Sequence, residues 1–457
     1  MATQRPAPRP RRAHIAQAAA GSADAGAAAP PPQPSAARRD GRRPAAARRA
    51  PRIGLALAGG GPLGAIYEIG ALCALQEGLH GFDCNDLSGY VGVSAGGFIA
   101  AGLANGMTPR QLCSAFIENT GPREDLVRPE QFIRPAWGEY ARRGAALPGL
   151  LLQAGLRFAL GRRALLSALE ILGRALPTGL LSPAPLEAQI RRVLSAPGRS
   201  NDFRQLKRKL VLVATDLDSG QAAPFGQPGW DHVPISVAAA ASAALPGLFP
   251  PVPIGARWYA DGALKKTLHA SVLLESGLDL LICLNPLVPF DALPARRRVR
   301  AGGDARIPRL VAGGLPVVLS QTFRSLIHSR LELGLERYGR THAGTDIVLF
   351  EPDHHDPEMF LANTFGYAQR RALAEHAYQH TRADLRSRRS TLRPTLAAHG
   401  IRLNDEVLDD ARRTLLGRGR RPRSRAARTL QRLDEVLDDL DAALTARGSG
   451  RAGVQPR

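Results

Sequence analysis

Short apolar runs alternate with longer segments of helical spacing through the middle of the chain. The runs are IGLALA (53–58), GYVGV (89–93), KLVLVATDL (209–217), LDLLICLN (278–285) and DIVLFEP (346–352). Each run is almost continuously apolar, which is typical of strands that are buried on both faces. Such strands, separated by helices, predict an α/β fold with a mostly parallel central sheet covered by helices on both sides.

The two ends of the chain follow a different pattern. Residues 1–51 are mainly Ala, Pro and Arg with almost no large apolar side chain, so we expect a disordered N-terminal tail. Residues 384–457 contain Arg clusters and two copies of DEVLDD, at 405–410 and 434–439, and we interpret them as a basic, partly helical tail. The folded domain is therefore expected over residues 52–383.

Residues 144–181 form a distinct segment inside that domain. Leu and Ala dominate it, acids are scarce, and four arginines interrupt the apolar positions: Arg157, Arg162, Arg163 and Arg174. One interpretation is a basic amphipathic helix pair that lies at a bilayer interface or covers an apolar pocket as a lid. The alternative is a helical insertion packed on the body of the protein.

The net charge of +21 is unevenly distributed over the 457 residues. Residues 1–52 carry eleven Arg and two Asp, and residues 381–457 carry eighteen Arg and ten acids, so residues 53–380 are left with a net charge of only +4. Basic tails suit an anionic surface, either phospholipid headgroups or nucleic acid, or they simply keep the chain soluble. They contain no aromatic residue that could stack on bases, which argues against nucleic acid.

The cysteines and the N-terminus bear on the cellular compartment. The four cysteines are Cys73, Cys84, Cys113 and Cys283, and they form no CxxC pair, so we expect a reduced interior without a disulfide scaffold or zinc site. The first residues lack the apolar core of a secretory signal, and no stretch reaches transmembrane length. The expectation is a cytoplasmic protein that touches membranes peripherally, with an organellar presequence left open.

A glycine-rich loop follows the first predicted strand, in the order Gly59, Gly60, Gly61 and, one turn later, Gly64. Glycines let successive backbone N–H groups face one point, and a helix N-terminus adds positive potential, so the loop can hold a phosphate or an oxyanion. A dinucleotide site would need an acid at the end of the second strand, but Asp83 and Asp86 precede that strand. No Gly-Lys-Ser/Thr follows the glycines, which excludes a Walker loop.

Ser94 lies in GVSAG (92–96), directly after the second predicted strand and before a helix of small residues. This is the context of a nucleophile elbow, in which Gly92 and Gly96 allow a sharp turn that exposes the hydroxyl. The alternative is a small residue at a tight turn, but it leaves the glycine loop one strand earlier unexplained.

A serine nucleophile needs a base. Four histidines follow Ser94 without a local pattern that marks any of them: His269, His328, His354 and His355. Asp261 is the better candidate, because an apolar run delivers it to a strand end and Gly262 then lets the chain turn. Asp216 and Asp218 compete, although their Asp-x-Asp-Ser-Gly setting is more typical of a turn.

Five motifs in chain order resemble those of the patatin-like phospholipases. They are GGGPLG (59–64), GVSAG (92–96), ATDLDSGQAAPFG (214–226), AASAALPGLFPPV (240–252) and DGAL (261–264), and the resemblance covers roughly residues 53–290. It implies a three-layer α/β/α core and a lipid acyl hydrolase with a Ser–Asp dyad, which uses no catalytic histidine, metal or cofactor.

The resemblance also assigns roles to individual residues. Ser94 matches the family nucleophile, Asp261 the base within its Asp-Gly-Ala motif (Gly262, Ala263), and the loop Gly59–Gly64 the oxyanion hole. Leu63 and Tyr67 stand where many relatives have a cation and a histidine, which puts in doubt a headgroup contact from this loop.

The implied activity is that of a phospholipase A or lysophospholipase, with a lipid ester as substrate and transient contact with a membrane surface. Two alternatives stay open. One is an esterase with a Ser-His-Asp triad, and the other is a catalytically silent membrane-binding protein that acts through its basic tails.

Overall fold

The computed structural model describes residues 49–122, 124–127, 134–159, 170–171, 173–291, 310–361 and 369–416. By its contacts the chain divides into Met1–Arg49 and Ala50–Arg457, and every element below belongs to the second unit. The predicted disordered tail (1–51) therefore lies almost wholly outside the described residues, as does the second DEVLDD copy at 434–439.

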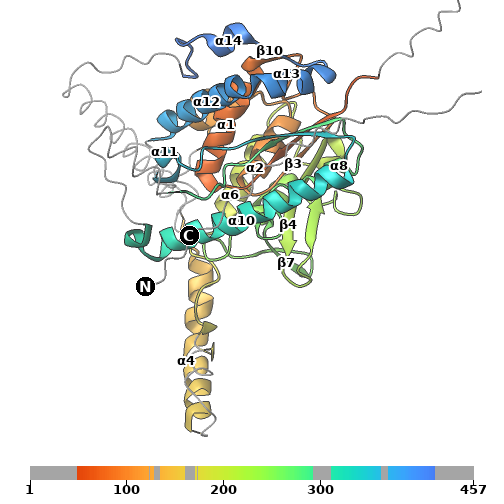
Figure 1. Ribbon diagram of the computed structural model, residues 1–457. Coiled ribbons are helices and arrows are strands. Elements are labelled where there is room, and N and C mark those ends of the chain that lie inside the picture. The colour runs from red at the N-terminus through yellow and green to blue at the C-terminus, as the bar shows by residue number, and fades with distance from the viewer. Residues whose placement is uncertain are drawn as a thin grey trace, which may run out of the picture. The chain divides into compact units, whose positions relative to one another are not determined.

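The central sheet of the described residues has eight strands, with the order β6-β7-β4-β3-β1-β8-β9 and β5 paired to β4 (Figure 1). Pairing is parallel from β4 through β3, β1 and β8 to β9, and antiparallel where β4 meets β5 and β7 and where β7 meets β6. The strands are β1 (Ile53–Leu57), β3 (Gly89–Gly92), β4 (Lys209–Asp216), β5 (Ala222–Phe225), β6 (Val252–Ile254), β7 (Arg257–Asp261), β8 (Leu280–Leu284) and β9 (Asp346–Phe350). All five apolar runs of the sequence are strands, so the predicted mostly parallel α/β sheet is confirmed.

Helices cover both faces of this sheet (Figure 1). Leu55 and Leu57 of β1 belong to a core that α1 (Gly61–Gly78), α2 (Ala95–Ala104), α3 (Pro109–Cys113), α6 (Ala184–Leu194), α7 (Ile235–Ser242) and α12 (Arg370–Ser387) complete. Ala56 and Ala58, which alternate with those leucines, belong to a second core with α8 (Ser271–Leu274) and α10 (Gly314–Thr341). The result is the three-layer α/β/α arrangement that the resemblance implied.

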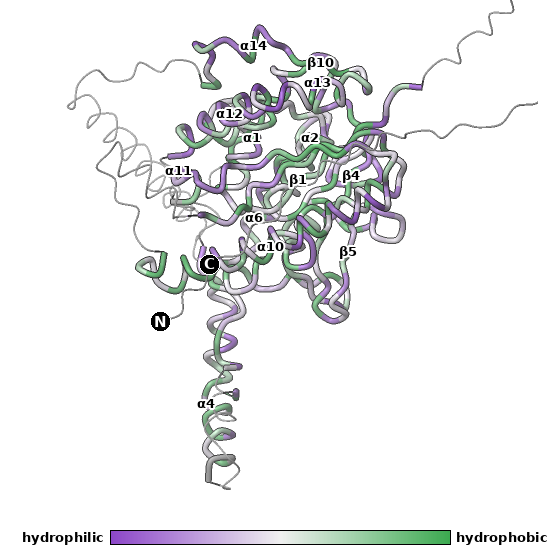
Figure 2. Tube along the Cα trace, viewed as in Figure 1, coloured by the Kyte–Doolittle hydropathy of each residue, from purple (hydrophilic) through white to green (hydrophobic). Residues whose placement is uncertain are grey.

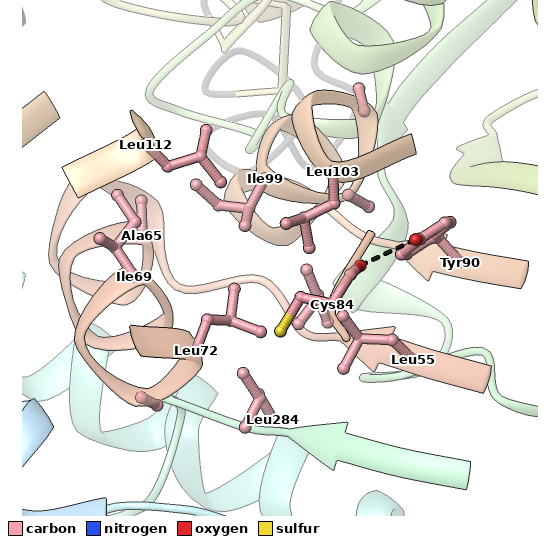
Figure 3. Close-up of a cluster of buried hydrophobic side chains, with 14 of the residues drawn as sticks. Leu55, Ala65, Ile69, Leu72, Cys84, Tyr90, Ile99, Leu103, Leu112 and Leu284 are labelled. Carbon is pink, nitrogen blue, oxygen red and sulfur yellow. Dashed lines mark hydrogen bonds between the residues drawn. The ribbon is translucent and has the colours of Figure 1, made fainter. Parts of the chain in front are cut away.

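The larger core packs tightly around α1 (Figure 3). Ile69 and Leu72 of α1, Ile99 of α2 and Leu284 of β8 are fully buried there. Tyr90 of β3 is also buried, and its hydroxyl donates to the Cys84 carbonyl at 2.8 Å. All four cysteines are buried and unpaired.

The C-terminal segment differs from the predicted tail. The expected boundary at residue 384 falls inside α12, whose Tyr378 and Arg382 are buried. The Arg382 guanidinium donates to the carbonyls of Val407, Leu408 and Asp410. The segment continues through α13 (Arg389–Ala398), β10 (Arg402–Leu403), which pairs with β2 (Leu79–His80), and α14 (Asp405–Asp409). Residues up to 416 are therefore part of the folded body, because the arginines that gave them a tail-like composition satisfy backbone carbonyls and acids within it.

The segment predicted at 144–181 begins earlier, with α4 (Trp137–Ala159). Glu139 anchors the N-terminal end of α4. It pairs with Arg142 and Arg143 and accepts a hydrogen bond from the Thr178 hydroxyl. Beyond Arg143 most described side chains are exposed, including Leu151 and Leu152. Figure 2 shows that hydrophobic and hydrophilic positions are mixed along the trace of α4. Arg157, Arg162 and Arg163 lie outside the residues whose side chains are described. In the part of the chain that the structure describes, no helix is long and apolar enough to cross a membrane.

Candidate active site

Ser94 occupies the turn between β3 and α2. Its backbone is at φ 53° and ψ −125°, a region that residues with a side chain rarely adopt. Such strain is kept only where the surrounding structure enforces it, which is common at functional sites. α2 begins at the next residue, and within the described residues the amides of Ala95 and Gly96 have no hydrogen-bond partner. The hydroxyl of Ser94 therefore lies at a helix N-terminus.

Ser242 holds this turn in place. The Ser94 amide donates to the Ser242 hydroxyl at 2.8 Å, and that hydroxyl donates to the carbonyl of Val213 in β4 at 2.7 Å. Ser242 is the last residue of α7 and is fully buried. The sequence analysis quoted its motif (240–252) without assigning a role to Ser242, and nothing in the local spacing marked it.

The glycine loop lies directly against Ser94. A Cβ built on Gly59 would lie 2.9 Å from the Ser94 Cβ and 3.5 Å from the Ala263 Cβ, so no larger residue fits without displacing the serine. Among the described residues no partner is found for the amides of Gly59, Gly60 and Gly61. The Gly64 amide, in contrast, donates to the Gly60 carbonyl at 3.0 Å. Gly64 was predicted as part of the oxyanion loop, but its amide is already used to close the first turn of α1.

Asp261 ends β7, and the turn that follows brings its neighbours towards Ser94. A Cβ on Gly262 would lie 2.1 Å from the Val213 carbonyl oxygen and 3.1 Å from a methyl of Val93, so the turn crosses the end of β4. The Asp261 carboxylate accepts from the Ala263 amide at 2.8 Å and also interacts with the Ser94 hydroxyl. Asp261 and Ser94 are both buried, with exposed fractions of 3% and 8%.

Burial sets the basicity of this carboxyl. Removal from water raises the pKa of Asp261 from 3.8 to about 6, and the hydrogen bonds from Ser94 and the Ala263 amide only partly oppose the rise. A carboxylate with a pKa of about 6 is ionised at pH 7 and is still a far better proton acceptor than an ordinary aspartate.

The competing acids are engaged elsewhere. The Asp216 carboxylate pairs with Arg257 at 2.6 Å and accepts from the amides of Asp218 and Ser219. Burial would raise its pKa, but these partners outweigh burial and lower it. Asp218 accepts from the amide of Trp258 at 3.2 Å. Both acids therefore stabilise a turn.

None of the four candidate histidines has a hydrogen bond to the Ser94 hydroxyl among the described residues. His269 is buried with its Nε2 3.2 Å from the Gly262 carbonyl, and burial lowers its pKa to about 4. It therefore supports the Asp261 turn as a neutral imidazole. His328 and His354 lie together near Glu351, and His355 pairs with Asp353.

The molecule is a three-layer α/β protein in which a strained serine, a buried carboxyl and loop amides without a partner among the described residues meet at the carboxyl edge of the parallel strands. Groups of these kinds serve as nucleophile, base and oxyanion donors in serine ester hydrolases.

Comparison with known families makes the class specific. Residues 55–274 match the model of the patatin-like phospholipases, the family whose motifs this sequence resembles. No curated protein matches the sequence.

Solved structures that are similar to this chain include VipD and ExoU. VipD from Legionella pneumophila has 18% identity and a TM-score of 0.30, with 71% of this chain and 67% of VipD covered. The type III effector ExoU has 16% identity and a TM-score of 0.29, with 74% of this chain covered. Full-length ExoU from Pseudomonas aeruginosa, solved in complex with SpcU, has 19% identity and a TM-score of 0.23, with 63% of this chain covered. The chain spans about half the length of these ExoU chains, 53% in both cases.

Proposed function

We propose that this protein hydrolyses carboxylic esters of lipids, as a phospholipase A or lysophospholipase, with Ser94 as nucleophile and Asp261 as general base. The observation that carries the proposal is the meeting of three groups: the strained Ser94, the buried Asp261 beside its hydroxyl, and Gly59 packed against Ser94 and Ala263. Among the described residues, the partners of the Asp261 carboxylate are the Ala263 amide and the Ser94 hydroxyl, with no cation beside them, which leaves the carboxylate available to the serine.

The reaction follows from these positions. Asp261 removes the Ser94 proton as the hydroxyl oxygen attacks the ester carbonyl, and the amides of the Gly59–Gly61 loop stabilise the oxyanion that develops. The alcohol or lysolipid leaves with the proton that Asp261 returns. Water, deprotonated by the same carboxylate, then hydrolyses the acyl-enzyme. Two helix N-termini, those of α1 and α2, face the point where negative charge accumulates.

The two alternative functions find less support. A Ser-His-Asp triad requires a histidine beside Ser94, and His269, the nearest in sequence to Asp261, is turned to the Gly262 carbonyl. A silent scaffold has no need for a strained serine or for a buried carboxyl that destabilises the fold.

Contact with a membrane surface is part of the proposal. Exposed apolar side chains lie on α4 (Leu147, Leu151, Leu152 and Leu156) and on α10 (Leu315, Val318, Leu319, Phe323 and Leu326). A lipid hydrolase must extract its substrate from an aggregate, and such side chains gain free energy on entering the acyl boundary.

A fluorophosphonate probe tests the nucleophile directly. We expect the wild-type protein to be labelled on the peptide that contains Ser94, and Ser94→Ala to be unlabelled and inactive on phospholipid and lysophospholipid substrates. Ser276→Ala is the matched control, because its hydroxyl accepts from Lys209 far from the site. Labelling that persists in a folded Ser94→Ala protein would exclude Ser94 as the nucleophile.

A further inference from the structure

Three side chains that the proposed reaction does not use form a compact cluster. They are His328 of α10, Glu351 directly after β9, and His354 in the turn that follows, and one ligand atom from each lies within 4.8 Å of the others. Glu351 Oε1 is 3.8 Å from His354 Nε2, and Glu351 Oε2 is 4.0 Å from His328 Nδ1. The two rings meet edge to face, with centroids 4.8 Å apart.

The outer nitrogens of both rings have partners. His354 Nδ1 lies 3.2 Å from the Pro289 carbonyl oxygen, which only accepts, so this nitrogen carries the proton and Nε2 presents a lone pair to Glu351. His328 Nε2 lies 3.5 Å from a carboxylate oxygen of Glu332. His328 Nδ1 is buried and has no hydrogen-bond partner among the described residues. Both imidazoles thus direct a free nitrogen to one point, while the opposite nitrogen faces a carbonyl or a carboxylate.

A hydrogen bond from a neighbouring side chain also orients the Glu351 carboxylate. Its Oε2 accepts from the side-chain amide of Asn285 at 3.3 Å, and the Asn285 backbone amide donates to the Phe350 carbonyl at 3.0 Å. Asn285 is fully buried at the end of β8. An outer layer of hydrogen bonds that orients two histidines and one carboxylate is the arrangement found around metal ligands in proteins.

We propose that His328, Glu351 and His354 bind a divalent transition-metal ion, with zinc the best fit. Two imidazole nitrogens and one carboxylate oxygen are ligands that zinc accepts, and three protein ligands leave a fourth position for water. Ligands about 2.0–2.1 Å from a tetrahedral ion lie roughly 3.4 Å from one another. The 3.8 and 4.0 Å separations involve different oxygens of Glu351, and the three ligand atoms lie within 4.8 Å of one another, so binding would draw them together by up to about 1.4 Å.

The position of the cluster indicates what the ion would do. It joins α10, on one face of the sheet, to the ends of β8 and β9. Pro286, the residue after Asn285, packs on the glycine loop, since a Cβ on Gly60 would lie 2.8 Å from its ring. A bound ion would thus tether α10 to the edge of the sheet beside that loop, as a structural clamp. His354 also lines a surface hollow with Pro286, Pro289 and Phe290, and its side chain is 33% exposed to solvent.

Metal binding to the purified full-length protein tests this proposal without any measurement of activity. After removal of metals by a chelator, titration with ZnCl₂ in a calorimeter should give one ion per chain and a rise in thermal midpoint. His328→Ala, His354→Ala and Glu351→Gln should each weaken zinc binding by at least about tenfold. Cobalt(II) should report the same site through a visible spectrum of low-symmetry coordination.

Two histidines serve as matched controls. His355 is adjacent to His354 but pairs with Asp353, and His342 contacts Thr341 at the end of α10. His355→Ala and His342→Ala should bind zinc as the wild type does. Glu351→Gln preserves the shape of the side chain, so it keeps the test valid if a histidine variant fails to fold. Absence of zinc binding, or equal binding by the wild type and a folded Glu351→Gln variant, would overturn the proposal.

Discussion

Asp261 and Asp216 are equally buried but differ in their surroundings. Each ends a strand of the same antiparallel pair, β7 and β4, and their exposed fractions are 3% and 2%. Asp216 has the Arg257 guanidinium and two turn amides, which lower its pKa despite burial. Asp261 has one amide and the Ser94 hydroxyl, and burial raises its pKa to about 6. Burial thus makes a carboxylate a stronger base only where no cation compensates for the lost water.

Replacing Asp261 and Asp216 one at a time should give the largest difference in catalytic activity between two variants. We expect Asp261→Asn to reduce kcat/KM for ester hydrolysis by about a thousandfold or more, because the Ser94 proton loses its acceptor. Asp216→Asn keeps an oxygen for the turn amides and should change kcat/KM by less than about threefold. Steady-state kinetics on a soluble short-chain ester measures both.

The two aspartate variants are compared only after circular dichroism shows that each is folded. Equal losses in both would mean that Asp261 acts through the fold and not on Ser94.

The close packing of Gly59 against Ser94 predicts that a larger residue at position 59 lowers kcat. In Gly59→Ala the new methyl would lie 2.9 Å from the Ser94 Cβ, so the loop or the serine must shift. Displacement of an oxyanion donor from its position lowers kcat by on the order of a hundredfold. Gly255→Ala is unsuitable as a control because Gly255 has positive φ, whereas Gly138→Ala meets no atom within 4 Å and should retain full activity. Retention of activity by Gly59→Ala would argue against this loop as the oxyanion site.

The raised pKa of Asp261 predicts the pH dependence. The base must be ionised, so kcat/KM should fall about tenfold for each pH unit below about 6 and reach a plateau above it. A profile with its midpoint near 4, the ordinary pKa of an aspartate, would contradict a base whose pKa is raised by burial.

The same shift has a consequence for stability. Since the folded state binds this proton more tightly than the unfolded chain, the stabilising contribution is complete below pH 3.8 and is lost as the pH rises through about 6. Asp261→Asn should therefore be more stable than the wild type at pH 7, by up to about 3 kcal/mol, and similar to it at pH 4. Urea unfolding at the two pH values measures the difference.

The smallest loss of Ser94 reactivity is expected from a substitution at Ser242. Ser242→Ala leaves the Ser94 amide and the Val213 carbonyl unpaired, which costs about 1–3 kcal/mol and loosens the turn. We expect about a tenfold slower reaction with the fluorophosphonate probe. Ser236→Ala, in the same helix, removes a hydroxyl that donates to Glu187, and should cost stability without slowing the probe.

The sequence was most informative about features that depend on residues close together in the chain. Continuous apolar runs identified five of the eight strands of the central sheet. Small residues after two of these strands identified the glycine loop and the turn at Ser94. It was misleading at residues 384–416, where arginines suggested a solvated tail. Composition alone does not reveal that Arg382 satisfies three backbone carbonyls in the interior.

The sequence by itself determined five of the eight strands of the central sheet, the family motifs and the short list of candidate acids. Only the tertiary structure decided which acid lies beside Ser94, that Gly64 has no free amide, and that Ser242, 148 residues away, fixes the Ser94 turn. The physical reason is that basicity and positioning depend on lost water and on partners distant in the chain, whereas strand and turn formation depend on neighbours in sequence.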